Sequence, residues 1–379
     1  MVKKTIEGSF AVAEAIKNCE PDVAACYPIT PSTHVAEELA SFYANGELKS
    51  FIATESELSS MSACIGASAA GSRTLTATSS QGLALMHEAV YNAAGMRLPI
   101  LMIVGNRALG APLNIWNDWQ DSITERDAGW IQIYCENAQE ATDTVPQAFK
   151  VAEATSLPIM VCFDGFYITH SVEPVEVPSL EEVRKFLPKF SPQVKLDPKN
   201  PISMGEYAFP QHYQAFREDL HKDLLASEKK VKEAHDEYAK MFGRSYGNGL
   251  LEEYKSEDAD YVFVSMGSVC GNAKEAVDQL RAKGEKAGLV RLRLFRPFPY
   301  EAVAKALQGK KSVGVFEKAY SLGALPPVYA EVSAALADAK QRPVLSSFTG
   351  GLGGKDVTVN HVIELFGKIK QGKKLVEWV

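Results

Sequence analysis

The 379-residue sequence has few cysteines, and no two of them form a C-x-x-C pair. The six are scattered along the chain: Cys19, Cys26, Cys64, Cys135, Cys162 and Cys270. This scatter favours reduced, buried thiols in a cytoplasmic protein over a disulfide framework. None of the seven histidines has metal-ligand spacing with another His or Cys, so no metal site is predicted on this chain.

Hydropathy, net charge and composition further limit the class of protein. No run of eighteen apolar residues occurs, and residues 1–7 lack the apolar core of a signal peptide, so neither a membrane span nor secretion is expected. A formal charge of −7 argues against nucleic acid or an anionic membrane surface as a partner. Apolar residues at 46% and charged residues at 23% are ordinary values for a globular protein with a full core.

Nucleotide and nucleophile motifs are also missing or incomplete. No G-x-S-x-G elbow is present. Residues 367–374 nearly match a phosphate-binding loop, but Lys374 stands where Ser or Thr would bind magnesium, so the match is interpreted as chance. The cluster Gly350–Gly354 precedes a helical pattern without the order of a dinucleotide site. A structural turn is the favoured interpretation of this cluster, and a ligand-binding or interface loop remains the alternative.

Apolar strand patterns alternate with helical patterns from residue 8 to about 163. The run 99–104 is continuously apolar, which is typical of a strand buried on both faces. Helices are predicted at about 31–43, 56–70, 83–94 and 138–154, with strands at about 23–27, 50–53, 74–78, 130–134 and 158–163. This alternation predicts an α/β fold with a parallel sheet covered by helices.

The alternation stops at about residue 164 and resumes at about 260. Seven prolines fall between Pro174 and Pro210, so regular elements are not expected there, and a charged helix follows at about 214–240. Residues 260–367 again alternate strand and helix patterns. The predicted organisation is a first α/β domain at 1–178, a linker wrapping it at 179–257, and a second, smaller α/β domain at 258–379.

Four polar segments of the first domain each follow a predicted strand. They are 27–33, 55–57, 78–82 and 105–121. Because ligand sites of parallel sheets form at the carboxyl ends of the strands, we interpret these segments as one site rather than four independent turns. Each also has a simpler interpretation: Thr30 and Ser32 as part of a turn and helix cap, and Glu55 or Glu57 as an acid in a first helical turn.

Taken together, these segments resemble the α subunits of the pyruvate:ferredoxin and other 2-oxoacid:ferredoxin oxidoreductases. The matching stretches cover nearly the whole chain: Tyr27–Thr33, Glu55–Glu57, Thr78–Gly82, Gly105–Ala108, Asn114–Asp118, Gly129–Gln132, Asp164–Phe166, Arg296–Pro299 and Phe348–Gly354. The resemblance implies a thiamine diphosphate enzyme that converts a 2-oxoacid and coenzyme A to acyl-CoA and carbon dioxide. The first domain would be a pyrimidine-binding domain and the second a transketolase C-terminal-like domain.

The same resemblance assigns roles to individual residues. Glu57 matches the glutamate that bonds the aminopyrimidine ring, with Glu55 as its competitor; sharing a proton there activates the cofactor. Thr30 and Arg107 match the positions that hold the substrate carboxylate, and Asn114 is expected beside them. Further contacts to the cofactor are expected from Pro28, Ile29, Ser80 and Gln81.

Two elements of a complete thiamine enzyme are missing from the sequence. The magnesium- and diphosphate-binding motif, Gly-Asp-Gly with a later Asn, is absent, as are the cysteine runs of iron–sulfur clusters. The resemblance therefore implies β-, γ- and δ-type partner subunits that bind Mg²⁺ and diphosphate, carry the clusters and pass electrons to ferredoxin. Pyruvate is the preferred substrate, and a branched-chain 2-oxoacid is the alternative. A scaffold subunit without a site, or a different thiamine enzyme of the transketolase or indolepyruvate type, would be the other interpretations.

Overall fold

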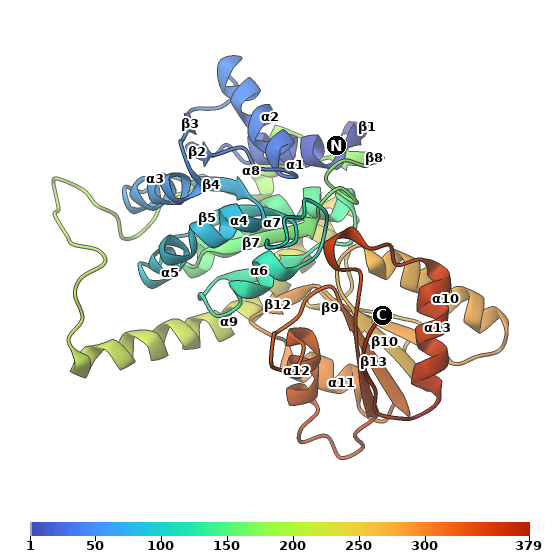
Figure 1. Ribbon diagram of the computed structural model, residues 1–379. Coiled ribbons are helices and arrows are strands. Elements are labelled where there is room, and N and C mark those ends of the chain that lie inside the picture. Colours follow the sequence, from blue (N-terminus) through green and yellow to red (C-terminus); the bar gives the residue numbers. More distant parts are fainter. Residues whose placement is uncertain (1) are drawn as a thin grey trace.

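The computed structural model describes residues 2–379 and contains two large sheets, one above the other in Figure 1. The first sheet has seven strands, and all neighbours are parallel except the outermost pair. In spatial order they are β12 (Leu294–Arg296), β6 (Ile131–Tyr134), β7 (Ile159–Asp164), β5 (Ile100–Asn106), β4 (Thr74–Thr78), β2 (Val23–Cys26) and β3 (Phe51–Ala53). β5 lies at the centre with every residue buried, as its continuous apolar run predicts.

Helices pack around the first sheet in two groups. One group is α1 (Gly8–Asn18), α2 (Thr33–Ala44) and α7 (Ala138–Thr155). The other is α3 (Glu57–Ala69), α4 (Ser80–Leu85) and α5 (His87–Gly95). The structure therefore confirms the predicted α/β class, but it divides the predicted helix 83–94 at Met86, whose dihedral angles are φ −89° and ψ 6°. The apolar period does not register this break, because both helices bury similar side chains, such as Leu83 and Val90.

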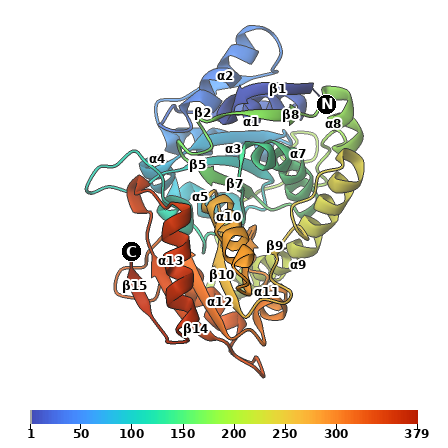
Figure 2. The same ribbon diagram turned by 90° about the vertical axis from the view of Figure 1, so that its right-hand side faces the viewer.

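The second sheet belongs to the C-terminal part of the chain. Its strands are β15 (Val376–Trp378), β14 (Val344–Thr349), β13 (Ser312–Glu317), β10 (Tyr261–Ser265), β11 (Ala287–Leu292) and the antiparallel β9 (Leu251–Tyr254). Four helices cover it: α10 (Val269–Ala282), α11 (Tyr300–Leu307), α12 (Pro327–Ala335) and α13 (Val359–Lys370). Figure 2 shows this sheet below the first, with the segment after β14 reaching up to the loop that follows β5.

The expectation that residues 174–210 lack regular elements is wrong. β8 (Val172–Val177) pairs antiparallel with β1 (Val2–Glu7), and α8 (Leu180–Phe186) follows. Pro174 is tolerated because β8 belongs to a two-stranded ribbon, where one edge needs no N–H donor. α8 begins with a capping box between Ser179 and Glu182, a signal that the proline count concealed.

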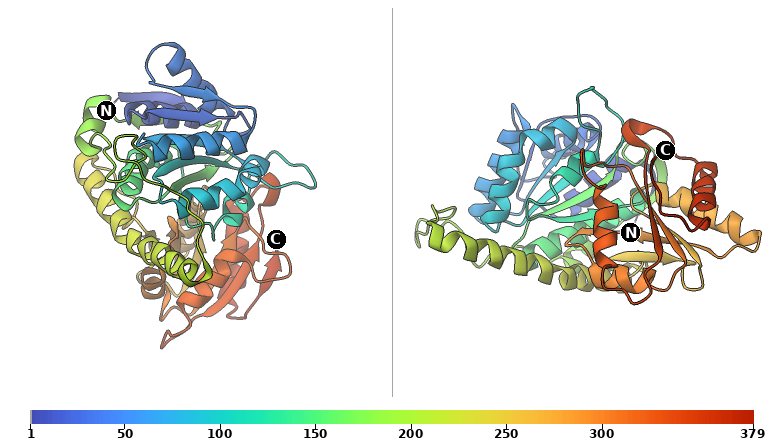
Figure 3. Two further views of the ribbon diagram at one scale, coloured as in Figure 1. Left: turned by 90° about the vertical axis from the view of Figure 1, so that its left-hand side faces the viewer. Right: turned by 60° about the horizontal axis from the view of Figure 1, so that its bottom comes forward.

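The predicted charged helix is confirmed as α9 (Pro210–Phe242), which packs against α7 and α5. In Figure 3 it runs along the outside of the first sheet toward the second. No helix within residues 2–379 has an apolar stretch long enough to span a membrane.

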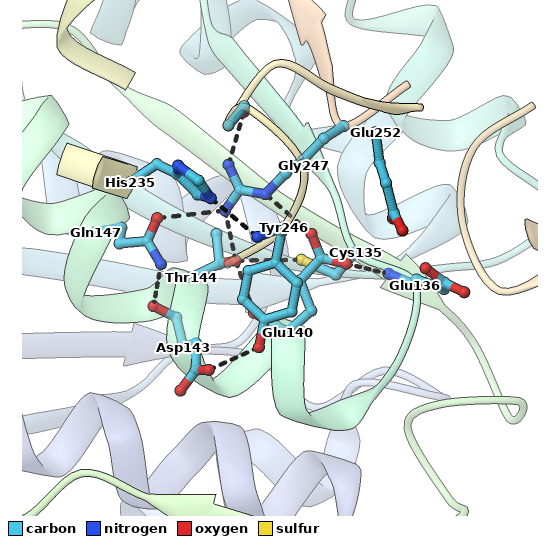
Figure 4. A network of polar contacts seen from close by, with 12 residues as sticks. Cys135, Glu136, Glu140, Asp143, Thr144, Gln147, His235, Tyr246, Gly247 and Glu252 are labelled. Atoms are coloured by element: carbon cyan, nitrogen blue, oxygen red, sulfur yellow. Dashed lines mark hydrogen bonds and ion pairs between the residues drawn. The ribbon is translucent and has the colours of Figure 1, made fainter. Parts of the chain in front are cut away.

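A buried polar network joins the two sheets. Glu140 of α7 accepts from Arg291 Nη1 at 2.8 Å and from Arg293 Nε at 2.9 Å. Asp143, one turn further along α7, accepts from Arg244 and from the hydroxyl of Tyr246, each at 2.6 Å. Figure 4 shows the contact between Asp143 and Tyr246. Burial alone would lower the pKa of Arg291, but the neighbouring carboxylates, Glu140 above all, raise it. These interactions fix the second sheet, and the segment before it, on the first.

Candidate functional site at the carboxyl edge of the first sheet

The loop after β2 is held between two neighbouring strand ends. Pro31 lies against Gly105 at the end of β5 and Gly165 just after β7; a Cβ at Gly165 would lie 2.6 Å from the Pro31 ring. Glycine at these positions lets the loop approach the sheet closely. Thr30, Asn106 and Asp164 are thereby gathered at one edge of the sheet, as the strand-end argument predicts.

Arg107 and Thr30 lie together at this edge. Arg107 donates from Nη1 to the Thr30 carbonyl at 3.0 Å and from Nε to the Asn114 carbonyl at 2.9 Å. Its Nη2 makes no hydrogen bond to any residue that the structure describes. Burial lowers the pKa of Arg107, though a guanidinium remains charged at neutral pH. The pair thus offers a fixed cation with free donors, a suitable partner for a carboxylate.

Glu57 is the second unusual charge at this edge. It begins α3 and is only 6% exposed, yet its carboxylate has no hydrogen-bond or ion-pair partner within residues 2–379. Gly82 of α4 makes room for it, since a Cβ there would lie 2.5 Å from Oε1. Glu55 by contrast is exposed and bonds the hydroxyl of Ser59. A buried, unpaired carboxylate costs free energy unless a ligand pairs with it, so Glu57 is the better candidate.

The turn into α4 lies between Arg107 and Glu57. Ser80 is fully buried and adopts φ +50°, a left-handed conformation that is uncommon outside glycine. Asp121 accepts its N–H at 2.9 Å and also accepts the N–H of Arg107 at 2.9 Å. The next residue, Gln81, lies under the loop after β5, where a Cβ at Gly110 would be 2.7 Å from Gln81 Nε2.

Burial raises the pKa of Asp121 to about 6, although the N–H donors around it lower the value. Burial likewise raises the pKa of neighbouring Asp118 to about 7. Such shifts are typical of functional sites, and Asp121 sits at the centre of this one.

The loop after β5 is fastened to the Gly350–Gly354 cluster, which includes η1 (Leu352–Gly354). Asn114 donates to the Gly353 carbonyl at 3.0 Å, and Gly354 donates to the Asn117 carbonyl at 2.7 Å. The glycine cluster is therefore an interface between the two sheets. The side chain of Asn114, expected at the substrate, is engaged in this interface, while its backbone carbonyl holds Arg107.

A second contact between the sheets lies next to this loop. Lys318 donates to Asn117 at 3.0 Å and to Asp164 at 3.1 Å, and all three side chains are buried. Asp164 also accepts from the indole of Trp119 at 2.8 Å. The site is consequently built on a segment braced from both sheets.

Of the remaining predicted residues, Pro28 is exposed and Ile29 half-buried on the loop that carries Thr30. The structure thus brings Thr30, Arg107, Ser80 and Gln81 into one connected group, with Glu57 linked to it through Gly82. Sequence reasoning did not single out Asp121 or Lys318. Nothing in the sequence separates Asp121 from Asp118, because the role of Asp121 depends on backbone N–H groups that only the fold brings together.

Comparisons with a solved structure and with family models identify the class of protein to which this fold corresponds. A 2-oxoglutarate:ferredoxin oxidoreductase from Magnetococcus marinus superposes with a TM-score of 0.71 at 21% identity, covering 97% of this chain and 65% of that chain. Residues 14–236 match the family model of the thiamine diphosphate-binding domain of pyruvate flavodoxin/ferredoxin oxidoreductases. Residues 259–362 match core domain II of pyruvate:ferredoxin oxidoreductase.

Relatives agree over the full length. The pyruvate synthase subunit PorA of Methanothermobacter thermautotrophicus is 49% identical, covering 100% of this chain and 98% of the relative. The ketoisovalerate oxidoreductase subunit VorA of Pyrococcus abyssi is 43% identical, covering 100% of this chain and 97% of the relative. The chain belongs to the 2-oxoacid:ferredoxin oxidoreductases, a family of thiamine diphosphate-dependent oxidoreductases.

Proposed function

We propose that this chain is the α subunit of a pyruvate:ferredoxin oxidoreductase and contributes the pyrimidine half of its thiamine diphosphate site. The observation that carries the proposal is the buried, unpaired carboxylate of Glu57 beside the Gly82 cradle. Greater identity to a pyruvate synthase subunit than to a ketoisovalerate subunit supports pyruvate over a branched-chain 2-oxoacid. The overall reaction would convert pyruvate, coenzyme A and oxidised ferredoxin to acetyl-CoA, carbon dioxide and reduced ferredoxin.

The donor set at the edge fits thiamine diphosphate. Glu57 offers a carboxylate to a ring nitrogen in a poorly solvated position, where a charge-assisted hydrogen bond is strong. Gln81 directly precedes Gly82, which abuts Glu57, and Ile29 lies on the loop that carries Thr30, with Pro28 more exposed. When bound, the cofactor supplies a carbon nucleophile for the 2-oxoacid carbonyl. Glu57 would hold a proton at the pyrimidine nitrogen, and this proton favours activation of the cofactor.

Substrate positioning falls to Arg107 and Thr30. The free Nη2 of Arg107 and the Thr30 hydroxyl would bind the 2-oxoacid carboxylate and aim its carbonyl at the cofactor. No second cation flanks Arg107 among its hydrogen-bonding neighbours, which are Thr30, Asn114 and Asp121. This arrangement suits a monocarboxylate such as pyruvate.

Partner subunits would supply the remaining parts. We propose that they bind Mg²⁺ and the diphosphate, carry the iron–sulfur clusters, bind coenzyme A and deliver electrons to ferredoxin, in the cytoplasm. All six cysteines of this chain are buried, and burial raises the thiol pKa of each. Three exposed apolar side chains on β3, α3 and α4, namely Ile52, Leu58 and Leu85, would offer a surface for the diphosphate-binding subunit.

The test compares Glu57→Gln with Glu55→Gln in the complex assembled with its partner subunits. We expect the Glu57 variant to lose affinity for thiamine diphosphate and at least about 100-fold in pyruvate-dependent reduction of a viologen dye. The Glu55 variant should stay within about threefold of wild type, because its carboxylate is exposed. The reverse order of effects would exchange their roles, and turnover by the isolated chain would contradict the subunit assignment.

A further inference from the structure

We propose that Asp121 is a positioning residue that couples the substrate arginine, Arg107, to the cofactor-facing turn at Ser80–Gly82. The inference rests on the proposed function, since it concerns how the two halves of that site are held in register. It assigns Asp121 no contact with substrate or cofactor. Its carboxylate acts through the backbone of both halves.

The geometry is specific to this one side chain. Oδ2 accepts the N–H of Ser80 at 2.9 Å and the N–H of Arg107 at 2.9 Å. Oδ1 accepts from Asn106 Nδ2 and from its own neighbour, the N–H of Ser122, both at 2.8 Å. All four donors are uncharged groups, so the carboxylate functions as a fixed set of acceptors rather than as a partner for a cation.

Ser80 needs such an acceptor. It lies two residues after the end of β4, while Arg107 directly follows the end of the neighbouring β5, and the two strands run parallel in register. Ser80 is fully buried in a left-handed conformation, and its hydroxyl reaches the carbonyl of Ala108. Without Asp121 its N–H would be a buried donor without a partner, a state that folded proteins avoid.

The connection continues from Ser80 to Glu57. Two residues further on, Gly82 touches the Glu57 carboxylate so closely that no Cβ fits between them. A movement of the Arg107 backbone on carboxylate binding is therefore transmitted through Asp121 to Ser80, and from there to the position of Glu57. The route consists of the Arg107–Asp121 and Asp121–Ser80 hydrogen bonds, the chain from Ser80 to Gly82, and the contact between Gly82 and Glu57.

This role predicts an unusual order of variants. An asparagine at 121 retains one oxygen that can accept both N–H groups. Asn106 Oδ1 is buried and has no partner in the described part of the chain, so rotation of the Asn106 amide would satisfy the new NH₂ group and leave only the Ser122 N–H without its acceptor. Alanine removes every acceptor. Asp121→Asn should therefore restore most of what Asp121→Ala loses, whereas a role that depends on charge would make both variants equally poor.

The experiment measures steady-state kinetics of the assembled complex for wild type, Asp121→Ala, Asp121→Asn and Glu317→Ala. Glu317 is a matched control, since it is another buried carboxyl that accepts two backbone N–H groups, from Val328 and Tyr329 in the second sheet's layer. For Asp121→Ala we expect two constants to rise: KM for pyruvate by at least about tenfold, and the thiamine diphosphate concentration that gives half-maximal activity by at least about fivefold. Asp121→Asn should stay within about threefold of wild type for both, and Glu317→Ala should lose thermal stability with both constants unchanged.

A loss of kcat with both constants unchanged in Asp121→Ala, or equal defects in the Ala and Asn variants, would overturn the proposal. Absence of pyruvate turnover in wild type would instead refute the proposed function. If Asp121→Ala does not assemble, hydrogen exchange in the wild-type complex decides. Adding pyruvate should slow exchange of the Ser80 amide together with that of Arg107, and an unchanged Ser80 amide contradicts the coupling.

Discussion

At the scale of single residues, the candidate site depends on two charges that the fold leaves incompletely paired. Glu57 is buried without a partner among the described residues, and Arg107 keeps Nη2 free. Folded proteins pair buried charges because desolvation is costly, so both groups are prepared for ligands. Asp121 nearby is, in contrast, well paired, since its carboxylate accepts from four donors.

Replacing Arg107 by alanine tests the substrate contact. An unpaired substrate carboxylate should cost about 2–4 kcal/mol, which corresponds to a rise in KM for pyruvate of roughly 30-fold or more. Initial-rate kinetics of the assembled complex measures the effect. Arg126→Ala is the control, since that guanidinium is half-buried and lies outside the loops of the site. Unchanged kinetics in Arg107→Ala would place the substrate elsewhere.

Gly82→Ala separates function from stability. The new methyl group would lie 2.5 Å from Glu57 Oε1, and a glutamate side chain moves aside at little cost. We expect an unchanged melting temperature to within about 2 °C but a clear loss of thiamine diphosphate affinity, measured by titration of the assembled complex. Gly66→Ala in the same helix as Glu57 meets no atom within 4 Å and should retain full affinity.

The sequence predicts the roles of only some of the residues in the candidate site. Glu57, Thr30 and Arg107 belong to segments that follow predicted strands, so their gathering at one edge follows from the parallel topology. The choice of Glu57 over Glu55 needed the resemblance, and burial then distinguished the two. The sequence does not distinguish Asp121 within the segment 105–121, because three of its four partners are backbone N–H groups, which leave no pattern in the order of side chains.

At the scale of elements, the loop after β5 is the least predictable part of the site. The sequence indicates an ordered loop but not what it packs on, because its partners lie more than 200 residues away at Gly353 and Lys318. Strands with apolar runs were located correctly because burial on both faces requires such runs. β8 was missed because an edge strand tolerates the proline that excludes a central one.

Gly354→Ala tests whether this loop is held from the second sheet. Gly354 has φ +83°, and a Cβ there would lie 2.4 Å from the Trp116 Cβ. Gly323→Ala is a matched control with φ +77° and no atom within 4 Å. Both should pay about 1–3 kcal/mol for the backbone conformation, measured by urea unfolding. Only Gly354→Ala should also raise KM for pyruvate; equal kinetics in the two variants would separate the loop from the site.

At the scale of the whole molecule, buried ion pairs between the sheets fix their relative position. Glu140 accepts from two arginines that are both fully buried, and the same helix provides Asp143 for Arg244 and Tyr246. Such pairs add little net stability compared with apolar packing, but removing one partner leaves uncompensated charge. The orientation of the sheets is therefore specified by charge as well as by shape.

Glu140→Ala should accordingly destabilise the chain by about 3–5 kcal/mol, because Arg291 and Arg293 would remain buried without their shared carboxylate. Urea unfolding followed by tryptophan fluorescence measures the loss. Glu237→Ala breaks the exposed pair with Lys150 and should cost no more than about 1 kcal/mol. A Glu140 variant as stable as the Glu237 variant would show that the two arginines do not depend on this carboxylate.

The pairing of β12 with β6 has a consequence for how this chain matures. Residues 294–296 close one edge of the N-terminal sheet, yet they are synthesised after β10 and β11 of the other sheet. During translation the β6 edge is therefore exposed for more than 150 residues of chain growth, and an open strand edge is a template for wrong pairing. Expression of a fragment ending near residue 257 would leave that edge permanently open. The N-terminal sheet is therefore completed only after the ribosome has synthesised β12, which lies in the C-terminal part of the chain.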